Sequence, residues 1–135
     1  MGFYIAKQTV KKLTAAKKNL NDAVVLVMGA TFKEDVSDIR NSKVADVIKE
    51  LKSFGLNVEV VDPHADSEEL NHEYGFGLIE KAGNNYDAVV VAVNHATYKS
   101  LDESYFKSLM PVNGILVDIK GIYRGKIKEL TYWSL

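Results

Sequence analysis

The sequence of 135 residues has no cysteine, only two prolines, and no apolar run approaching the roughly eighteen residues that cross a bilayer. Without cysteine the chain can form no disulfide, thiolate nucleophile or cysteine-ligated zinc site. Seventeen basic residues against eighteen acidic ones give a net charge of -1, which argues against nucleic acid or membrane as a partner. The amino terminus lacks the charged-then-apolar pattern of a secretory signal. We therefore expect a cytoplasmic protein.

Short β-branched segments alternate along the chain with segments of helical periodicity. Strands are predicted at residues 23–28, 56–62, 86–93 and 114–119, and the first and last of these four read as buried strands. Residues 130–135 are predicted as a possible edge strand. Strands that alternate with helices form right-handed βαβ units. The predicted fold is therefore of the α/β class, a Rossmann-like three-layer sandwich with a mostly parallel sheet.

The first twenty residues read as a helix that starts without a capping residue. Phe3, Ala6, Val10 and Leu13 recur at helical spacing, which predicts an apolar face. We interpret residues 1–20 as the end of a longer helix, and residues 21–135 as the domain that follows. The lysines of this helix also allow a second interpretation, a basic surface that docks an anionic partner.

The loop after the first strand, GATFKEDVSDIRNSK, is crowded with charge. Gly29 stands alone, so the loop matches neither the dinucleotide fingerprint nor a P-loop. Lys33 and Arg40 both suit phosphate or carboxylate, and Asp35 and Asp38 are placed to orient them. The loop predicts an anion site, with a surface loop whose charges satisfy one another as the alternative.

The loops after the second and third strands carry weaker signals. Asp62 stands where an acidic residue would hold a ribose, but with Pro63 behind it we interpret it as a turn former. His64, His72 and His95 lack the spacing of metal ligands, so no metal site is predicted. His95 is interpreted as an exposed capping residue, with a catalytic base as the alternative.

The loop after the fourth strand begins DIKGIYRGK. Lys120 is expected to face the cleft at the carboxyl ends of the strands. Tyr123 and Arg124 either contact a base or belong to an ordinary polar turn. No nucleophile, base and orienting group converge anywhere, so no catalytic residue is predicted. The chain reads as the ligand-binding part of a larger protein.

Four segments, GATFKEDVSDIRNSK, VEVVDPHA, YDAVVVAVNHATYK and GILVDIKGIYR, resemble in order the carboxy-terminal domain of the UDP-glucose/GDP-mannose dehydrogenase family. The resemblance implies a UDP-binding domain of an NAD-dependent enzyme that oxidises C6 of a UDP-sugar to a carboxylate. The catalytic cysteine and most of the NAD site would belong to an amino-terminal domain, so this chain alone should be inactive. The first helix would join the two domains and build a homodimer.

The resemblance also assigns roles to single residues. Phe32 and Lys33 would contact the nucleotide sugar, and Arg40 would reach the pyrophosphate of NAD. Lys120 would bind substrate, although many UDP-glucose members carry arginine there. This variant resembles members that act on UDP-N-acetylhexosamines in capsule or O-antigen synthesis. The alternative function is a non-catalytic Rossmann-like module that binds a nucleotide or docks a partner.

Overall fold

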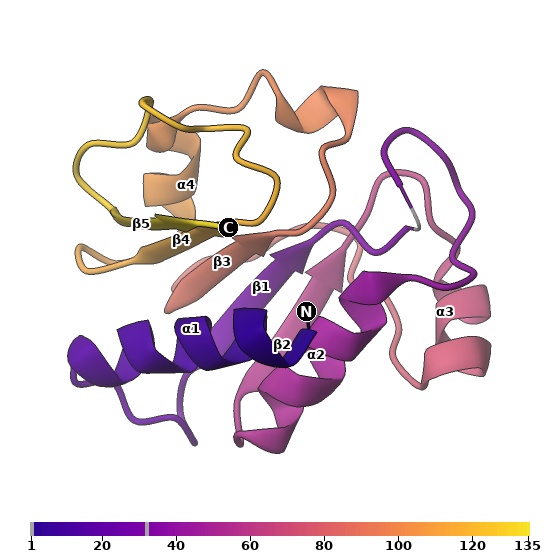
Figure 1. Ribbon diagram of the computed structural model, residues 1–135, viewed down its shortest axis with the longest axis horizontal. Helices are drawn as coiled ribbons and strands as arrows, with labels where there is room; N and C mark the ends of the chain where they lie inside the picture. The colour runs from indigo at the N-terminus through magenta and orange to yellow at the C-terminus, as the bar shows by residue number, and fades with distance from the viewer. Residues whose placement is uncertain (1, 32) are drawn as a thin grey trace.

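The computed structural model describes residues 2–31 and 33–135, and its centre is a five-stranded parallel sheet (Figure 1). The strand order is β2-β1-β3-β4-β5. The strands are β1 (Val24–Met28), β2 (Asn57–Val61), β3 (Ala88–Val91), β4 (Ile115–Asp118) and β5 (Thr131–Ser134). The helices are α1 (Gly2–Ala15), α2 (Lys43–Ser53), α3 (Ser67–Tyr74), α4 (Glu103–Leu109) and the short 3-10 helix η1 (Ala96–Tyr98).

All five predicted strands are present: β1 starts one residue later than predicted, and each of the other four is one or two residues shorter at both ends. Every residue of β3 and β4 is buried, as expected of β-branched strands covered on both faces. β5 pairs only with β4 and lies at the sheet edge, which confirms that prediction. The sheet is wholly parallel.

Helices cover both faces of the sheet, so the predicted three-layer sandwich is confirmed (Figure 1). On one face, the buried residues of α1 and α2 pack against Val25 and Val27 of β1. On the other face, Phe106 of α4 packs with Leu26 and Val89. Alternate residues of β1 thus enter different cores, as the two-residue period of a strand requires.

Helix α1 packs closely against α2. A Cβ at Gly2 would lie 2.8 Å from the Cβ of Asp46, so a larger residue there would push the helices apart. Ile5 and Leu13 are fully buried in the core that α2 shares. Phe3 is 57% exposed, so its predicted place on the apolar face is wrong. The boundary near residue 20 stays a prediction.

A side chain caps the N-terminus of α3 and of α4, but not that of α2. Asp102 accepts the N–H of Tyr105 at 3.0 Å and so caps α4, and Asp66 caps α3 in the same way. Ser42 precedes α2, but its hydroxyl donates to the carbonyl of Ala30 at 3.0 Å instead of capping the helix. Within the described residues, no helix is long and apolar enough to span a bilayer.

Candidate functional site

The strand order reverses at β1, because the chain runs from β1 outward to β2 and then crosses back to β3. In open α/β sheets, ligands bind near such a reversal, beyond the carboxyl ends of the strands. A cavity of about 640 Å³ lies at this edge, next to Ala92 after β3 and Ile119 after β4. The cavity thus lies at the edge of the sheet where such folds bind ligands, and we take it as the candidate site.

The cavity combines an apolar wall with three cations. Val44 and Val47 of α2, which are 6% and 3% exposed, lie on its apolar side, and Ile5 of α1 is fully buried behind them. The cations are Lys43, Lys120 and Arg124, and no acidic side chain is among the described residues that line the cavity. Such a lining suits a ligand that carries both a flat apolar group and negative charge.

The first turn of α2 presents Lys43 to the cavity, whereas its acidic residue, Asp46, is not among the described residues that line it. Lys43 and Val44, its first two residues, line the cavity. The hydroxyl of Ser42 is engaged with Ala30, so no side-chain cap occupies the first N–H groups of the helix. Uncapped N–H groups at the positive end of a helix dipole favour an anion.

The buried carboxylate of Asp118 shapes the loop that carries Lys120 and Arg124. It accepts the N–H groups of Ile122 at 3.1 Å and Tyr123 at 2.7 Å, and the hydroxyl of Tyr132 at 2.6 Å. Burial, followed by the hydrogen bond to Asp118, raises the pKa of Tyr132 to about 12. The phenol therefore remains a hydrogen-bond donor across the physiological pH range. The contacts of Asp118 thus hold the turn after β4 in place.

Tyr123 and Arg124, the two candidates in this loop for contact with a base, occupy different environments. Tyr123 is fully buried and its hydroxyl donates to the carbonyl of Tyr98 at 2.6 Å, so of the two alternatives for this residue, contact with a base is ruled out. Arg124 lines the cavity, and its Nη2 donates to the carbonyl of Leu135 at 2.7 Å. A ligand can therefore meet Arg124 but not Tyr123.

Some of the charged side chains in the loop after β1 form ion pairs and hydrogen bonds with one another. Asp38 accepts Nε of Arg40 at 3.1 Å and Nη2 at 3.0 Å, which confirms that Asp38 orients Arg40. The hydrogen bond to the Arg40 side chain lowers the pKa of Asp38 to about 2. Among the described residues, no ion pair joins Asp35 to Lys33, and the Asp35 carboxylate accepts the N–H of Ala96 at 2.8 Å.

The predicted site residues occupy different places. Lys120 lines the cavity at the ends of β3 and β4. Arg40, 85% exposed, lines a neighbouring hollow of about 550 Å³, and Lys43 lines both. Lys33 is exposed and borders neither of these two, while Phe32 lies outside the described residues. A crevice shared by Lys33 and Arg40 stays a prediction.

His95 is fully buried, so the interpretation of an exposed capping residue is wrong. Its Nε2 lies 3.0 Å from Oδ2 of Asp62, and its Nδ1 accepts the N–H of Asp35 at 2.9 Å. Asp62 also accepts the N–H groups of His64 at 2.7 Å and Ala65 at 2.9 Å, which confirms it as a turn former. Burial alone would raise the pKa of Asp62, but these hydrogen bonds and that from Ala30 lower it.

Asp35, His64 and His95 place potential metal-ligand atoms within 4.8 Å of one another. The fold thus joins two histidines that the sequence left far apart. Both ring nitrogens of His95 are already hydrogen-bonded, so a metal would have to displace the N–H of Asp35. The expectation of no metal site stays a prediction.

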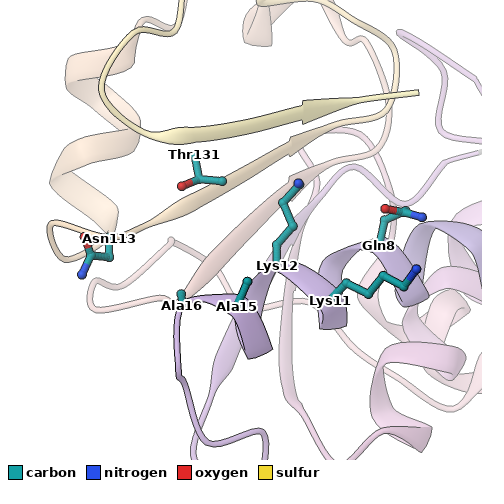
Figure 2. Close-up of a pocket in the computed structure, with 7 residues that line it drawn as sticks. All are labelled: Gln8, Lys11, Lys12, Ala15, Ala16, Asn113 and Thr131. Carbon is teal, nitrogen blue, oxygen red and sulfur yellow. The ribbon is translucent and has the colours of Figure 1, made fainter.

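A second cavity, of about 530 Å³, lies at the opposite edge of the sheet (Figure 2). Asn113 precedes β4 and Thr131 begins β5, while Lys12 extends from α1 toward Thr131. Lys18, farther along, pairs with Asp87 at 3.2 Å. This basic surface lies away from the strand ends where α/β sheets bind ligands.

Sequence reasoning assigned no role to two residues that build the site. Lys43 follows directly on Ser42, and its place at a helix start beside the sheet edge was a usable signal. Asp118 was recognised only as the end of a strand. Its role depends on Tyr132, fourteen residues away, and no local pattern reports such a contact.

Residues 26–125 match the family model of the UDP-glucose/GDP-mannose dehydrogenase family, UDP binding domain. The chain belongs to this family. It is 36% identical over 121 residues to the UDP-N-acetyl-D-glucosamine 6-dehydrogenase of Salmonella typhi, and the match covers 89% of the chain and 28% of that protein. It is 42% identical over 123 residues to Protein CapL of Staphylococcus aureus, covering 90% of the chain and 29% of CapL.

Solved structures show the same fold. The chain superposes with a TM-score of 0.84 on an NDP-N-acetyl-D-galactosaminuronic acid dehydrogenase from Methanosarcina mazei Go1, at 22% identity. The TM-score is 0.81, at 20% identity, for a UDP-D-ManNAc dehydrogenase from Pyrococcus horikoshii. Each match covers 98% of this chain, and 28% and 30% of those chains respectively. The chain thus spans under a third of the length of these relatives.

Proposed function

We propose that this chain is the nucleotide-sugar-binding domain of an NAD-dependent UDP-sugar 6-dehydrogenase. The observation that carries the proposal is the cavity at the ends of β3 and β4, with Lys43, Lys120 and Arg124 around an apolar wall. The match to the UDP binding domain of the family supports it. The whole enzyme would oxidise the C6 hydroxymethyl group of the sugar to a carboxylate.

In this proposal the three cations hold the diphosphate of UDP. Charge-assisted hydrogen bonds from Lys120 and Arg124 and the positive end of α2 offset the negative charge. The apolar wall at Val44 and Val47 receives the flat face of the base. Phe32 and Lys33 stay assigned to the nucleotide sugar, as the resemblance to the family implies.

NAD, which would accept the hydride, contacts this chain mainly through Arg40. The guanidinium is exposed, and Asp38 engages its Nε and Nη2, so the hydrogens on Nη1 can bind a phosphate. The described loops lack a glycine-rich turn for the rest of the cofactor. We therefore assign most of NAD binding to the amino-terminal domain.

The names of the relatives support a UDP-N-acetylhexosamine as the substrate. Surface polysaccharide synthesis as the pathway stays a prediction from the sequence resemblance. A homodimer and an amino-terminal domain of the same polypeptide are the expected partners. The cytoplasmic location expected from the sequence stays a prediction.

Thermal unfolding of the 135-residue chain with UDP tests the proposal. If the Kd for UDP is about 10 to 100 μM, millimolar UDP should stabilise the fold by roughly 1–3 kcal/mol and raise the Tm. Lys33→Ala should reduce this shift strongly, and uridine, which lacks the diphosphate, should give a smaller one. A folded chain whose Tm does not change at millimolar UDP would contradict the proposal.

The basic surface at Lys11 and Lys12 favours a second candidate function, a partner-docking module (Figure 2). Charge reversal at these two lysines should then abolish association with an anionic partner and leave the UDP-induced shift unchanged. Lys18 is a poor site for this test, because its pairing with Asp87 belongs to the fold.

A further inference from the structure

The buried ring of His95 joins the loops that follow three strands. His95 itself follows β3, Asp62 follows β2, and Thr31 and Asp35 follow β1. A fully buried polar ring needs a partner for each nitrogen. Here Asp35, the partner of Nδ1, comes from the loop after β1, and Asp62, the partner of Nε2, comes from the loop after β2. His95 is therefore a cross-link at the edge of the sheet where the candidate site lies.

The hydrogen bonds determine which ring nitrogen carries the proton. Nδ1 accepts the N–H of Asp35 at 2.9 Å, so in this arrangement Nε2 carries the proton and donates to Asp62 at 3.0 Å. Oγ1 of Thr31 lies 3.4 Å from the same Nε2 and itself donates to the carbonyl of Lys33 at 2.8 Å. One ring thus contacts residues on both sides of Lys33.

The backbone at this point adopts an unfavourable conformation. Asp35 has a φ of 59°, in the left-handed region that residues other than glycine seldom adopt. Its N–H binds His95, and its carboxylate accepts the N–H of Ala96, so two reciprocal bonds tie it to the loop after β3. Such a conformation persists only where the surrounding contacts over-determine it.

We propose that His95 is a positioning residue for the sugar-nucleotide site. Through Thr31 and Asp35 it fixes the backbone that carries Lys33, and so determines where the Lys33 amine meets the ligand. The inference rests on the proposed function for the role of Lys33. It adds to that function a buried residue that touches no ligand.

Two substitutions at His95 distinguish the contribution of its hydrogen bonds from that of the volume of its ring. His95→Phe fills the space but removes both bonds, whereas His95→Gln keeps one donor and one acceptor at a similar separation. His72→Phe, on the exposed side of α3, is the matched control. All three are made in the 135-residue chain, and the Kd for UDP is measured by calorimetry. Amide hydrogen exchange of Asp35 is measured in the same variants without ligand.

We expect His95→Phe to weaken UDP binding by about tenfold, His95→Gln to weaken it less, and His72→Phe to leave it unchanged. Exchange of the Asp35 amide should accelerate in the same order. In a Lys33→Ala background, His95→Phe should cost less than about twofold, because the residue through which it acts is absent. The ring nitrogens of wild-type His95 should show the proton on Nε2 by NMR.

Full additivity of the Lys33 and His95 substitutions would overturn the proposal, as would UDP affinity or Asp35 exchange that His95→Phe does not change. A proton on Nδ1 would also contradict it. If the His95→Phe variant does not fold, the same comparisons made with His95→Gln test the proposal. A wild-type chain that does not bind UDP would instead overturn the proposed function, and the exchange of Asp35 would then show by itself whether His95 holds the loop.

Discussion

Oδ2 of Asp118 accepts the backbone N–H of Tyr123 at 2.7 Å and the hydroxyl of Tyr132 at 2.6 Å. One buried carboxylate therefore connects the end of β4, the turn after it and the edge strand β5. The turn presents Lys120 and Arg124 to the candidate site, so the position of two cations depends on a residue that carries the opposite charge and lies beneath them.

Asp118→Asn should lower the free energy of unfolding by about 2–3 kcal/mol, because an amide offers one acceptor oxygen and turns a donor toward N–H groups. Tyr132→Phe removes only one of the three bonds and should cost about 1–2 kcal/mol. Urea denaturation measures both. Equal costs for the two variants would show that the N–H contacts of Asp118 contribute nothing.

The cations of the cavity give a second prediction. Lys120→Ala and Arg124→Ala should each weaken UDP binding by about tenfold, the effect of losing one charge-assisted hydrogen bond. Lys126→Ala, in the same exposed loop but outside the described lining of the cavity, should have little effect. Calorimetry checks all three, and equal losses at the three positions would point to a diffuse charge effect.

Gly29 should resist substitution because of both conformation and space. Its φ is 100°, and an added Cβ would lie 2.8 Å from the Cβ of Val93, so Gly29→Ala should cost about 2–5 kcal/mol. Gly125 also has positive φ, but a Cβ added there would meet no atom within 4 Å beyond its chain neighbours. Gly125→Ala should therefore cost only about 1–2 kcal/mol. Unfolding in urea compares them, and similar costs would refute the steric part of the argument.

The pKa of Asp62 predicts acid sensitivity. Because it is lower in the folded chain than in the unfolded one, ionised Asp62 stabilises the fold at neutral pH, and this stability is lost as the pH falls below about 4. The Asp62→Asn variant has no carboxylate at this position, so it lacks this pH-dependent contribution to stability. The stability difference between wild type and Asp62→Asn, measured at about pH 7 and about pH 3, should therefore shrink in acid. A difference that does not change with pH would contradict this.

The chain by itself should reduce no NAD with any UDP-sugar, because it lacks cysteine and the glycine-rich cofactor loop. Absorbance of NADH at saturating UDP-sugar measures this, and UDP binding by the same sample shows that the domain is folded. Measurable turnover would contradict the assignment of catalysis to the amino-terminal domain.

The fold was predictable from local patterns, and part of the site was not. Strand positions follow from β-branched runs, and Asp62 as a turn former follows from its own neighbours. The burial of His95 could not be foreseen, because its partners Asp35 and Asp62 lie 60 and 33 residues away. Tyr123 is polar in a polar loop, yet its hydroxyl finds a carbonyl inside the core. The polarity of a side chain indicates that it needs a hydrogen-bond partner, but only the tertiary packing shows where that partner lies.

The amino-acid sequence alone determined the α/β class, the parallel strands and the family motifs, because hydrophobic period and short spacings act within a few residues. The tertiary structure decided which cations share a cavity. Lys43 begins α2, whereas Lys120 and Arg124 lie in the loop after β4, and they meet because the strand order brings the carboxyl ends of β3 and β4 beside the start of α2. Such a meeting depends on chain crossings over many tens of residues, which no local pattern encodes.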